Sequence, residues 1–150
     1  MTWVLVTLTF IDFDHQLLPD DIVLPTLWLG LALSLFEVYT TPVDSIIGAI
    51  AGYLFFWIIF HAFRILTGKE GMGPGDFKLM ALLGAWLGWQ FLPQIILLST
   101  FVGSIIGVSL IVTKKAALGN KIPFGPYIAI AGYIAMLWGN KLNEAYLSFI

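Results

Sequence analysis

Apolar segments separated by short polar ones dominate the pattern of residues along this chain. The apolar segments cover residues 1–11, 22–39, 45–63, 77–89, 95–113 and 127–139. A helix needs about 20 mostly apolar residues to cross the hydrocarbon core of a membrane, and helices satisfy their own backbone hydrogen bonds there. The pattern therefore predicts an all-α, polytopic membrane helical bundle of about six transmembrane segments.

Two of these segments are shorter than a full span. Residues 1–11 end directly at an acidic cluster, so we expect half a helix or a helix that continues further upstream. Residues 77–89 follow a glycine-rich stretch, and this helix is expected to begin inside that stretch or to cross the membrane only partway. The tail over residues 140–150 is weakly amphipathic.

Composition places much of the surface in lipid. The chain has 150 residues, of which 59% are hydrophobic and 11% charged, and its mean hydropathy is +0.94. A soluble domain carries about 25% charged residues, and so short a chain has too little interior to bury this many apolar side chains. The formal net charge of −2 argues against a nucleic-acid partner. We expect one membrane-embedded domain over residues 1–150.

Cysteine is absent from the sequence. This excludes disulfides, thiolate zinc sites and a cysteine nucleophile within these residues. Glycines four residues apart occur in three segments, as Gly48 and Gly52, Gly84 and Gly88, and Gly103 and Gly107. Glycine is frequent in membrane helices in any case, but three such pairs favour a compact bundle whose helices approach closely.

Basic residues predict the orientation of the segments. If each segment crosses the membrane once, the loops after the first, third and fifth lie on one side. These loops and their edges hold six of the seven basic residues, namely Arg64, Lys69, Lys78, Lys114, Lys115 and Lys121. Positive residues stay on the cytoplasmic side, so this side is expected to face the cytoplasm. Both chain ends then lie outside, and an outside N-terminus with no export signal predicts an upstream membrane helix.

Two aspartates at the membrane edge are the first candidates for chemistry. Asp76 follows Gly73-Pro74-Gly75 at the mouth of the fourth segment, and Asp12 ends the first segment. An aspartate in such a place is a functional candidate because burying its charge is costly. N-capping of a helix is the structural alternative for Asp76, and a solvated helix end is the alternative for Asp12. The two lie 64 residues apart in the chain but are predicted on the same membrane face at similar depth.

Paired carboxyl groups suit the hydrolysis of a peptide bond. Within about 3–5 Å both cannot ionise, so they share a proton and titrate as a pair. The ionised acid removes a proton from water, while the protonated acid polarises the scissile carbonyl and later protonates the leaving amine. The sequence has no G-x-S-x-G element, which makes a serine nucleophile less favoured.

Other polar and aromatic residues have structural explanations. His61 and Glu37 lie near the ends of predicted helices and are expected to be capping or interfacial groups. Most of the six tryptophans are expected at the membrane interfaces, where this residue collects.

Three motifs together resemble the type IV prepilin leader peptidases, the GxGD-type membrane aspartyl proteases of type IV pilus and type II secretion systems. The motifs are Asp12-Phe13-Asp14-His15 with Leu17-Leu18-Pro19-Asp20, Gly73-Pro74-Gly75-Asp76-Phe77-Lys78, and Ile122-Pro123-Phe124-Gly125-Pro126. They occur in the family's order and cover nearly the whole chain. A lone GxGD would be weak, but the combination is specific.

The resemblance implies that Asp12 and Asp76 are the catalytic pair of a peptidase with no metal in its site. It implies a multi-pass protein among the lipids of the bacterial inner membrane, which cleaves the short basic leader of prepilins or pseudopilins after a glycine, on the cytoplasmic side. Substrate-binding or supporting residues would be Asp14, His15, Asp20, Asp21, Gly73, Gly75 and Lys78. Acids among them would attract the basic leader. N-capping of the second helix is the alternative for Asp20 and Asp21, and interfacial anchoring is the alternative for Lys78.

Long members of the family carry an upstream membrane helix and a cytoplasmic domain. That domain often has two CxxC pairs that hold zinc, and it is associated with N-methylation from S-adenosylmethionine. Neither the domain nor any cysteine occurs in these residues. We therefore expect peptidase activity without a cofactor, and S-adenosylmethionine and zinc only together with the upstream region.

Two other functions fit parts of the pattern. A GxGD protease of different specificity, such as a preflagellin, signal-peptide or presenilin-like enzyme, would share the paired aspartates, but the first and third motifs resemble the prepilin branch. A proton- or cation-coupled transporter component would place paired acids along a pathway through the membrane. Here the acids are expected to cluster at one face.

Overall fold

Six α-helices make up the part of the chain that the structure describes. This computed structural model describes residues 1–15, 17–68, 73–114 and 124–150. The helices are α1 (Thr2–His15), α2 (Asp20–Ser34), α3 (Pro42–Thr67), α4 (Pro74–Leu87), α5 (Leu92–Val112) and α6 (Gly125–Ser148), with one 3₁₀ turn, η1 (Trp89–Phe91), before α5. No strand occurs in these described ranges. The predicted all-α bundle is confirmed.

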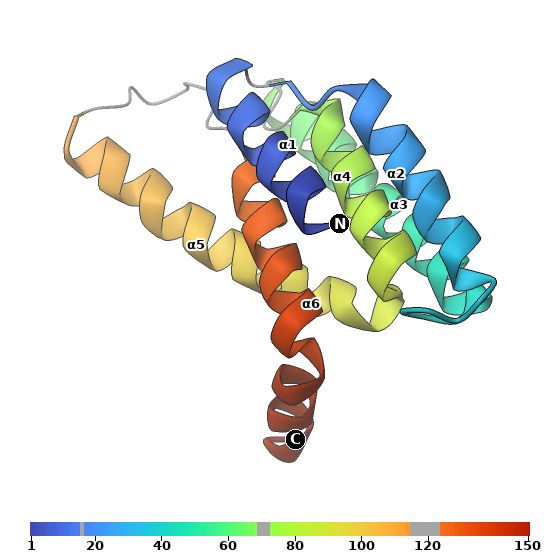
Figure 1. The fold of residues 1–150 in the computed structure, drawn as a ribbon. Helices are drawn as coiled ribbons and strands as arrows, with labels where there is room; N and C mark the ends of the chain where they lie inside the picture. The colour runs from blue at the N-terminus through green and yellow to red at the C-terminus, as the bar shows by residue number, and fades with distance from the viewer. Residues whose placement is uncertain (16, 69–72, 115–123) are drawn as a thin grey trace.

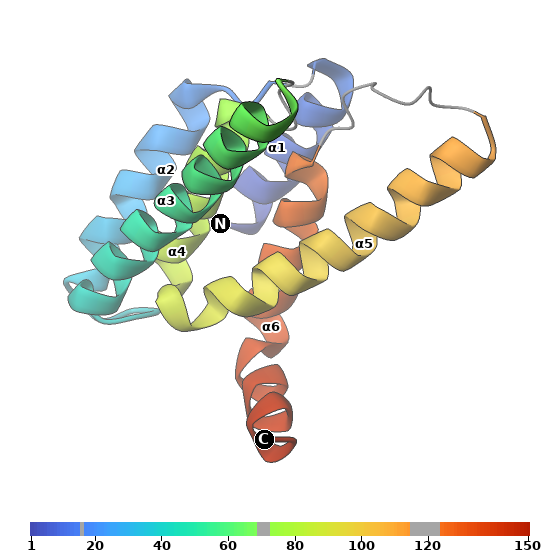
Figure 2. The ribbon, with the colours of Figure 1, turned by 180° about the vertical axis from the view of Figure 1, so that it is seen from behind.

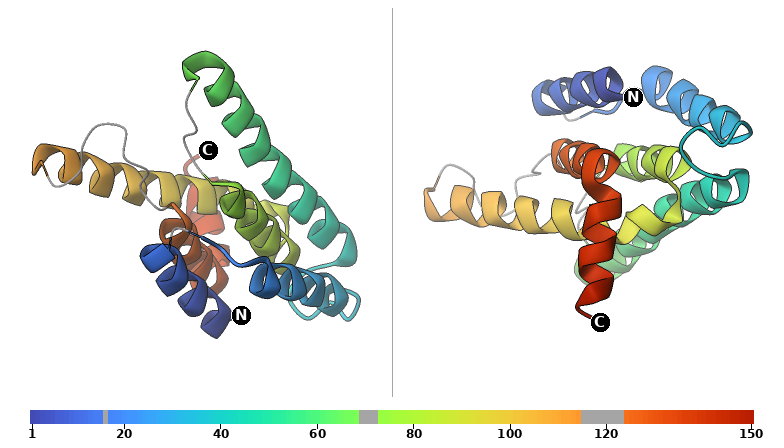
Figure 3. Two further views of the ribbon diagram at one scale, coloured as in Figure 1. Left: turned by 90° about the horizontal axis from the view of Figure 1, so that it is seen from above. Right: turned by 60° about the horizontal axis from the view of Figure 1, so that its bottom comes forward.

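The helices stack in three layers of two. Figure 3 shows, in its right panel, α1 and α2 in one outer layer, α6 and α4 in the middle, and α5 and α3 in the other outer layer. The helix pairs in contact agree, since α2 and α3 pack on α4 while α1 and α5 pack on α6. From Asp76 to Leu87 every residue of α4 except Lys78 is buried. This short apolar helix is therefore the centre of the bundle.

Alternate helices run in opposite directions. In Figure 1 the ends of α1, α3 and α5 and the beginnings of α2, α4 and α6 lie on the same side of the bundle. This is the side that carries Arg64, Lys78 and Lys114, whereas Lys69, Lys115 and Lys121 fall outside the described residues. Seen from behind in Figure 2, the second half of α6 projects beyond the other helices on the opposite side. The structure thus confirms the alternating arrangement expected from the sequence.

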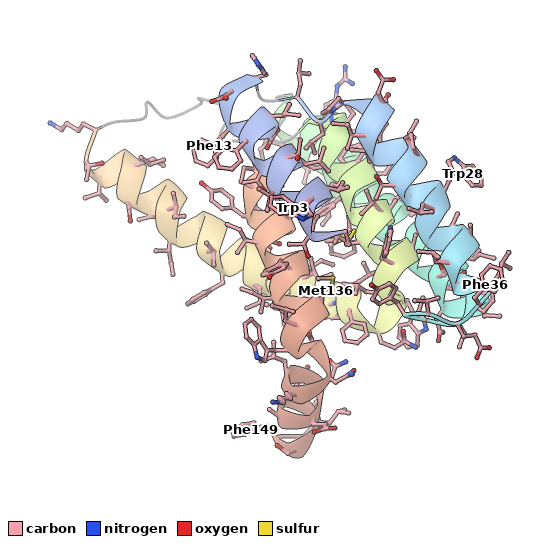
Figure 4. All side chains as sticks on the ribbon, in the orientation of Figure 1. Trp3, Phe13, Trp28, Phe36, Met136 and Phe149 are labelled. Carbon is pink, nitrogen blue, oxygen red and sulfur yellow. The ribbon has the colours of Figure 1, made fainter. Side chains whose placement is uncertain are left out.

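The exterior of the bundle is strongly apolar. Trp3, Trp28 and Phe149 lie on its outside (Figure 4) and are 82%, 66% and 92% exposed. Two helical stretches, α3 and Trp89–Val112, are long and apolar enough to cross a membrane, with mean hydropathy of 2.0 and 2.5. The other described helices do not meet that test, and α1 and α4, with 14 residues each, extend only about 21 Å. These features are those of a membrane protein whose helices differ in length.

The closest helix approach joins α3 to α4. Gly48 and Gly84 face each other, and a Cβ on either would collide with the backbone carbonyl of the other. One turn further on, a Cβ at Gly52 would lie 2.7 Å from the carbonyl oxygen of Met80. The close helix approach expected from the glycine spacing is confirmed at Gly48, Gly52 and Gly84. Gly88 has another role, because it ends α4 with φ +92°, a conformation that favours glycine.

Four helices end several residues away from the predicted positions. α2 ends at Ser34, five residues before the apolar segment 22–39 does. α1 continues to His15, so Asp12 lies inside the helix and not after it. α3 continues to Thr67 and ends at Gly68, which has φ +70° and donates its N–H to the carbonyl of Arg64. α6 continues through the polar tail to Ser148. Hydropathy marks where lipid contact ends, whereas a helix ends where a cap or turn stops it.

Trp86 corrects the expectation for one of the tryptophans. It is only 6% exposed, and its indole N–H donates to the carbonyl of Thr26 over 2.9 Å. Its ring lies against Gly30, where a Cβ would come within 2.6 Å. Trp86 therefore packs in the contact between α2 and α4 and not at an interface with lipid.

Candidate active site

Asp12 is a buried carboxyl group in the last turn of α1. It is 5% exposed, and the backbone N–H of Gly125 hydrogen-bonds to its carboxyl group. Its Oδ2 atom has no hydrogen-bond partner among the described residues. Asp12 therefore faces α6, and the alternative of a solvated helix end is wrong.

Asp76 is a second buried carboxyl group, at the third position of α4. The N-cap of this helix is Gly73, so the alternative that Asp76 is itself the N-cap is wrong. Its carboxyl group accepts a hydrogen bond from the backbone N–H of Gly73, which is the backward contact of a capping box. With 6% exposure, Asp76 is as buried as Asp12.

Gly125, the first residue of α6, is where the two carboxyl groups meet. A Cβ at this position would lie 2.5 Å from Asp12 Oδ2 and 3.4 Å from Asp76 Oδ1. The two oxygen atoms are therefore no further apart than the sum of these distances, 5.9 Å. Helices α1, α4 and α6 thus bring residues from three distant parts of the sequence into one site.

Two buried carboxyl groups at this distance favour a state with a single proton. Burial and mutual repulsion both oppose the doubly ionised pair, while the N–H groups of Gly73 and Gly125, both at helix N-termini, stabilise one negative charge. Such groups titrate as a unit. The arrangement can therefore supply a base and an acid to the same reacting group.

Gly75 allows the segment after α1 to reach the start of α4. A Cβ at Gly75 would lie 2.9 Å from the Cβ of Leu18, and Leu18 packs against the hydrophobic core. This contact connects the chain just after Asp12 to the turn that carries Asp76. Gly73 differs, because nothing lies within 4 Å of the position that its Cβ would take.

Lys78 pairs with Asp20. Its Nζ atom lies 2.7 and 2.8 Å from the two carboxylate oxygens of Asp20. Such an exposed ion pair contributes at most about 1 kcal/mol, but it holds the first turns of α2 and α4 side by side. The N-cap of α2 is Pro19, so Asp20 and Asp21 occupy the first turn without capping it.

The remaining residues predicted in the site lie at its margin. Asp14, His15 and Asp21 are exposed, and within the described residues no hydrogen bond or ion pair joins them to the aspartyl pair. Two residues along a helix correspond to about 200° of rotation, so Asp14 points away from Asp12. His61 bonds through Nδ1 to a carbonyl one turn earlier in α3, as befits a residue outside the site.

Gly125 is the residue that the sequence reasoning did not assign. It belongs to the third motif, which carried the family resemblance but no role. A Gly-Pro pair before an apolar segment signals the start of a helix, and this signal could have located α6. It could not show that α6 begins against Asp12 and Asp76. Ile122 and Pro123 of the same motif lie outside the described residues.

Comparison with known proteins agrees with the motifs. The prepilin leader peptidase/N-methyltransferase of Aeromonas salmonicida is 57% identical over 150 residues, which cover 100% of this chain and 52% of that protein. Proteins of the same name from Pseudomonas aeruginosa and Legionella pneumophila are 54% and 42% identical over 149 and 147 residues, covering 99% and 98% of this chain and 51% of each protein. The chain thus spans about half the length of the curated relatives it matches. No solved structure matches it. The type IV leader peptidase family matches residues 1–108, and the chain belongs to this family.

Proposed function

We propose that this chain is a membrane aspartyl endopeptidase that removes the short basic leader from type IV prepilins or type II secretion pseudopilins. Asp12 and Asp76 are its catalytic pair. The observation that carries the proposal is the meeting of two buried carboxyl groups at Gly125 in a chain of this family. We place the site at the cytoplasmic face of the bacterial inner membrane, because Arg64, Lys78 and Lys114 lie near the helix ends on the side where α1 ends and α4 begins.

The singly protonated pair is suited to each step of the hydrolysis. The carboxylate takes a proton from water, and the water oxygen attacks the scissile carbonyl carbon while the protonated carboxyl group donates its proton to the carbonyl oxygen. The tetrahedral intermediate then returns one hydroxyl proton to a carboxylate. The other carboxyl group protonates the nitrogen as the C–N bond breaks. The products are an acid and an amine, and the pair again holds one proton.

Exposed acids beside the pair suit a basic leader. The negative charge of Asp20 is compensated by Lys78, whereas Asp14 and Asp21 are exposed and form no ion pair with the described residues. Unpaired negative charge attracts and orients a positively charged segment. We therefore assign the attraction of the leader to Asp14 and Asp21 more than to Asp20.

Zinc and S-adenosylmethionine have no part in this proposal. The residues do not fit a thiolate zinc site, because the sequence has no cysteine, and no group of three His, Asp or Glu side chains in the described ranges is placed to hold a metal ion. The names of the relatives include N-methyltransferase. We propose residues 1–150 as the membrane-embedded peptidase domain and leave that second activity to the upstream region of the long family members.

Cleavage of a defined substrate in lipid tests the proposal. The 150-residue chain is reconstituted in vesicles with a peptide that has a basic leader, a glycine and an apolar segment. Mass spectrometry then identifies the cleavage products by their masses. We expect one cut, after the glycine. A matched peptide with glutamine in place of the leader lysines is expected to be cut more slowly, and one with leucine in place of the glycine to stay intact. No cleavage, or faster cleavage of a signal peptide or preflagellin, would contradict the assigned specificity.

A further inference from the structure

Gly125 is surrounded in a way that differs from the other helix glycines. Its φ is not positive, since the positive-φ glycines in the described residues are Gly68 and Gly88. The backbone at this position therefore accepts any L-residue. The three atoms nearest to a Cβ at this position are Asp12 Oδ2, Asp12 Cγ and Asp76 Oδ1, at 2.5, 3.0 and 3.4 Å. The atoms that a side chain here would meet first therefore belong to the aspartyl pair.

We propose that Gly125 is a positioning residue for the aspartyl pair, an inference that rests on the proposed function. Its backbone N–H hydrogen-bonds to the Asp12 carboxyl group, and its missing side chain leaves room for Asp12 Oδ2, which has no hydrogen-bond partner among the described residues. A buried acceptor left unpaired is costly unless a ligand or water uses it. Asp12 Oδ2 is the atom that takes the proton from the reacting water, and Gly125 leaves the space that this carboxyl group needs beside Asp76.

The position of α6 does not depend on this contact. Further along the helix, Gly132 lies against the side chain of Leu83, and Gly139 lies against the ring of Phe91. Both contacts bind α6 to α4 and η1 over several turns. A change at Gly125 therefore alters the carboxyl geometry before it alters the packing of the helix.

Replacing Gly125 with alanine tests the inference. The added methyl group would lie 2.5 Å from Asp12 Oδ2, so the carboxyl group must turn away. A displacement of about 1 Å in a reacting group costs about 100-fold in rate. In Gly125→Ala we expect kcat for the basic-leader peptide to fall about 100-fold while KM changes less than about threefold, because the leader and the apolar segment bind elsewhere.

Gly132→Ala is the matched control. It adds the same methyl group to the same helix, 2.6 Å from Leu83 Cδ2, where an apolar side chain and not a carboxylate must move. We expect this variant to lose at least as much thermal stability as Gly125→Ala and to keep kcat within about threefold of the wild type. If the two variants lose activity in proportion to their loss of stability, Gly125 has only a structural role and the inference is wrong.

A titration of the carboxyl groups provides a readout that does not need substrate. Infrared spectra of protein labelled with ¹³C-aspartate follow protonation, and Asp12→Asn and Asp76→Asn identify the bands of the pair. Coupling separates the two ionisation steps, so in Gly125→Ala, with the groups forced apart, we expect the steps to move closer together. A wild-type titration together with wild-type kcat in Gly125→Ala would overturn the inference and leave the proposed peptidase intact. If the two ionisation steps move closer together in Gly125→Ala but the protein cleaves no leader peptide, the inference on Gly125 is supported and the peptidase proposal fails.

Discussion

Asp12→Asn and Asp76→Asn are each expected to reduce leader cleavage at least about 1,000-fold, a rise of about 4 kcal/mol in the activation barrier. Asparagine keeps the size of the side chain and can still accept a hydrogen bond from Gly73 or Gly125. It cannot exchange a proton with water, a carbonyl oxygen or an amine. Either change therefore removes proton transfer and leaves the surrounding packing in place, and both initial rates and single-turnover rates in vesicles measure the loss.

The double variant separates a catalytic pair from two independent contributions. Residues that act as a unit show strongly non-additive losses, so Asp12→Asn with Asp76→Asn is expected to be no slower than the worse single variant. Glu144→Gln is the matched control, since it removes an exposed carboxylate from the far half of α6 and is expected to cleave at the wild-type rate. Cleavage within about tenfold of wild type in either single variant would mean that the pair is not the catalytic one.

Gly48→Ala and Gly84→Ala are expected to have the largest effect on stability. A methyl group on either glycine would be forced into the backbone carbonyl of the other, and a backbone carbonyl cannot rotate away as a side chain can. Overpacking costs about 1–3 kcal/mol or more, so α3 must move away from the buried central helix. For a chain of this length we expect the apparent Tm to fall by roughly 5–10 °C, measured by thermal unfolding in detergent or lipid.

The contact between Gly48 and Gly84 also predicts that the stability losses of the two substitutions are not additive. Once α3 and α4 have moved apart to accept one methyl group, a second methyl group costs less free energy of unfolding. The double variant is therefore expected to be more stable than the sum of the two single losses implies. Gly73→Ala is the control for crowding, because nothing lies within 4 Å of a Cβ there, and its Tm is expected to fall less than that of Gly48→Ala or Gly84→Ala, since only the preference for glycine at an N-cap is lost. Strictly additive losses would contradict the contact between Gly48 and Gly84.

Much of the fold follows from local features of the sequence. The apolar segments predicted the six helices, and their alternating directions predicted that Asp12 and Asp76 lie at the same end of the bundle, because both depend on the solvent that each stretch of chain meets. Helix ends were less predictable, since α3 ends at Gly68 through its left-handed conformation and not where hydropathy falls. The burial of Trp86 was not predictable, because its ring packs against Gly30 of another helix.

The site was predictable only in its separate parts. The motifs pointed to Asp12 and Asp76, but their meeting is a contact between helices, and a single sequence contains no signal for it. The same limit applies to Gly125, whose importance comes from the two side chains that face it. It applies as well to Lys78, which the sequence reasoning gave as a substrate-binding or supporting residue with interfacial anchoring as the alternative, and which the fold pairs with Asp20.

Cross-linking in lipid is the most direct test that Asp12 and Asp76 share one site. Because these 150 residues include no cysteine, Asp12→Cys with Asp76→Cys introduces two thiols and no others into this chain, and a short bifunctional thiol reagent followed by mass spectrometry detects the linked peptides. Asp14→Cys with Asp76→Cys is the control, since Asp14 points to the other side of α1. We expect efficient linkage of positions 12 and 76 and at least about tenfold less for positions 14 and 76. Equal linkage of both pairs, or none at 12 and 76, would contradict a shared aspartyl site.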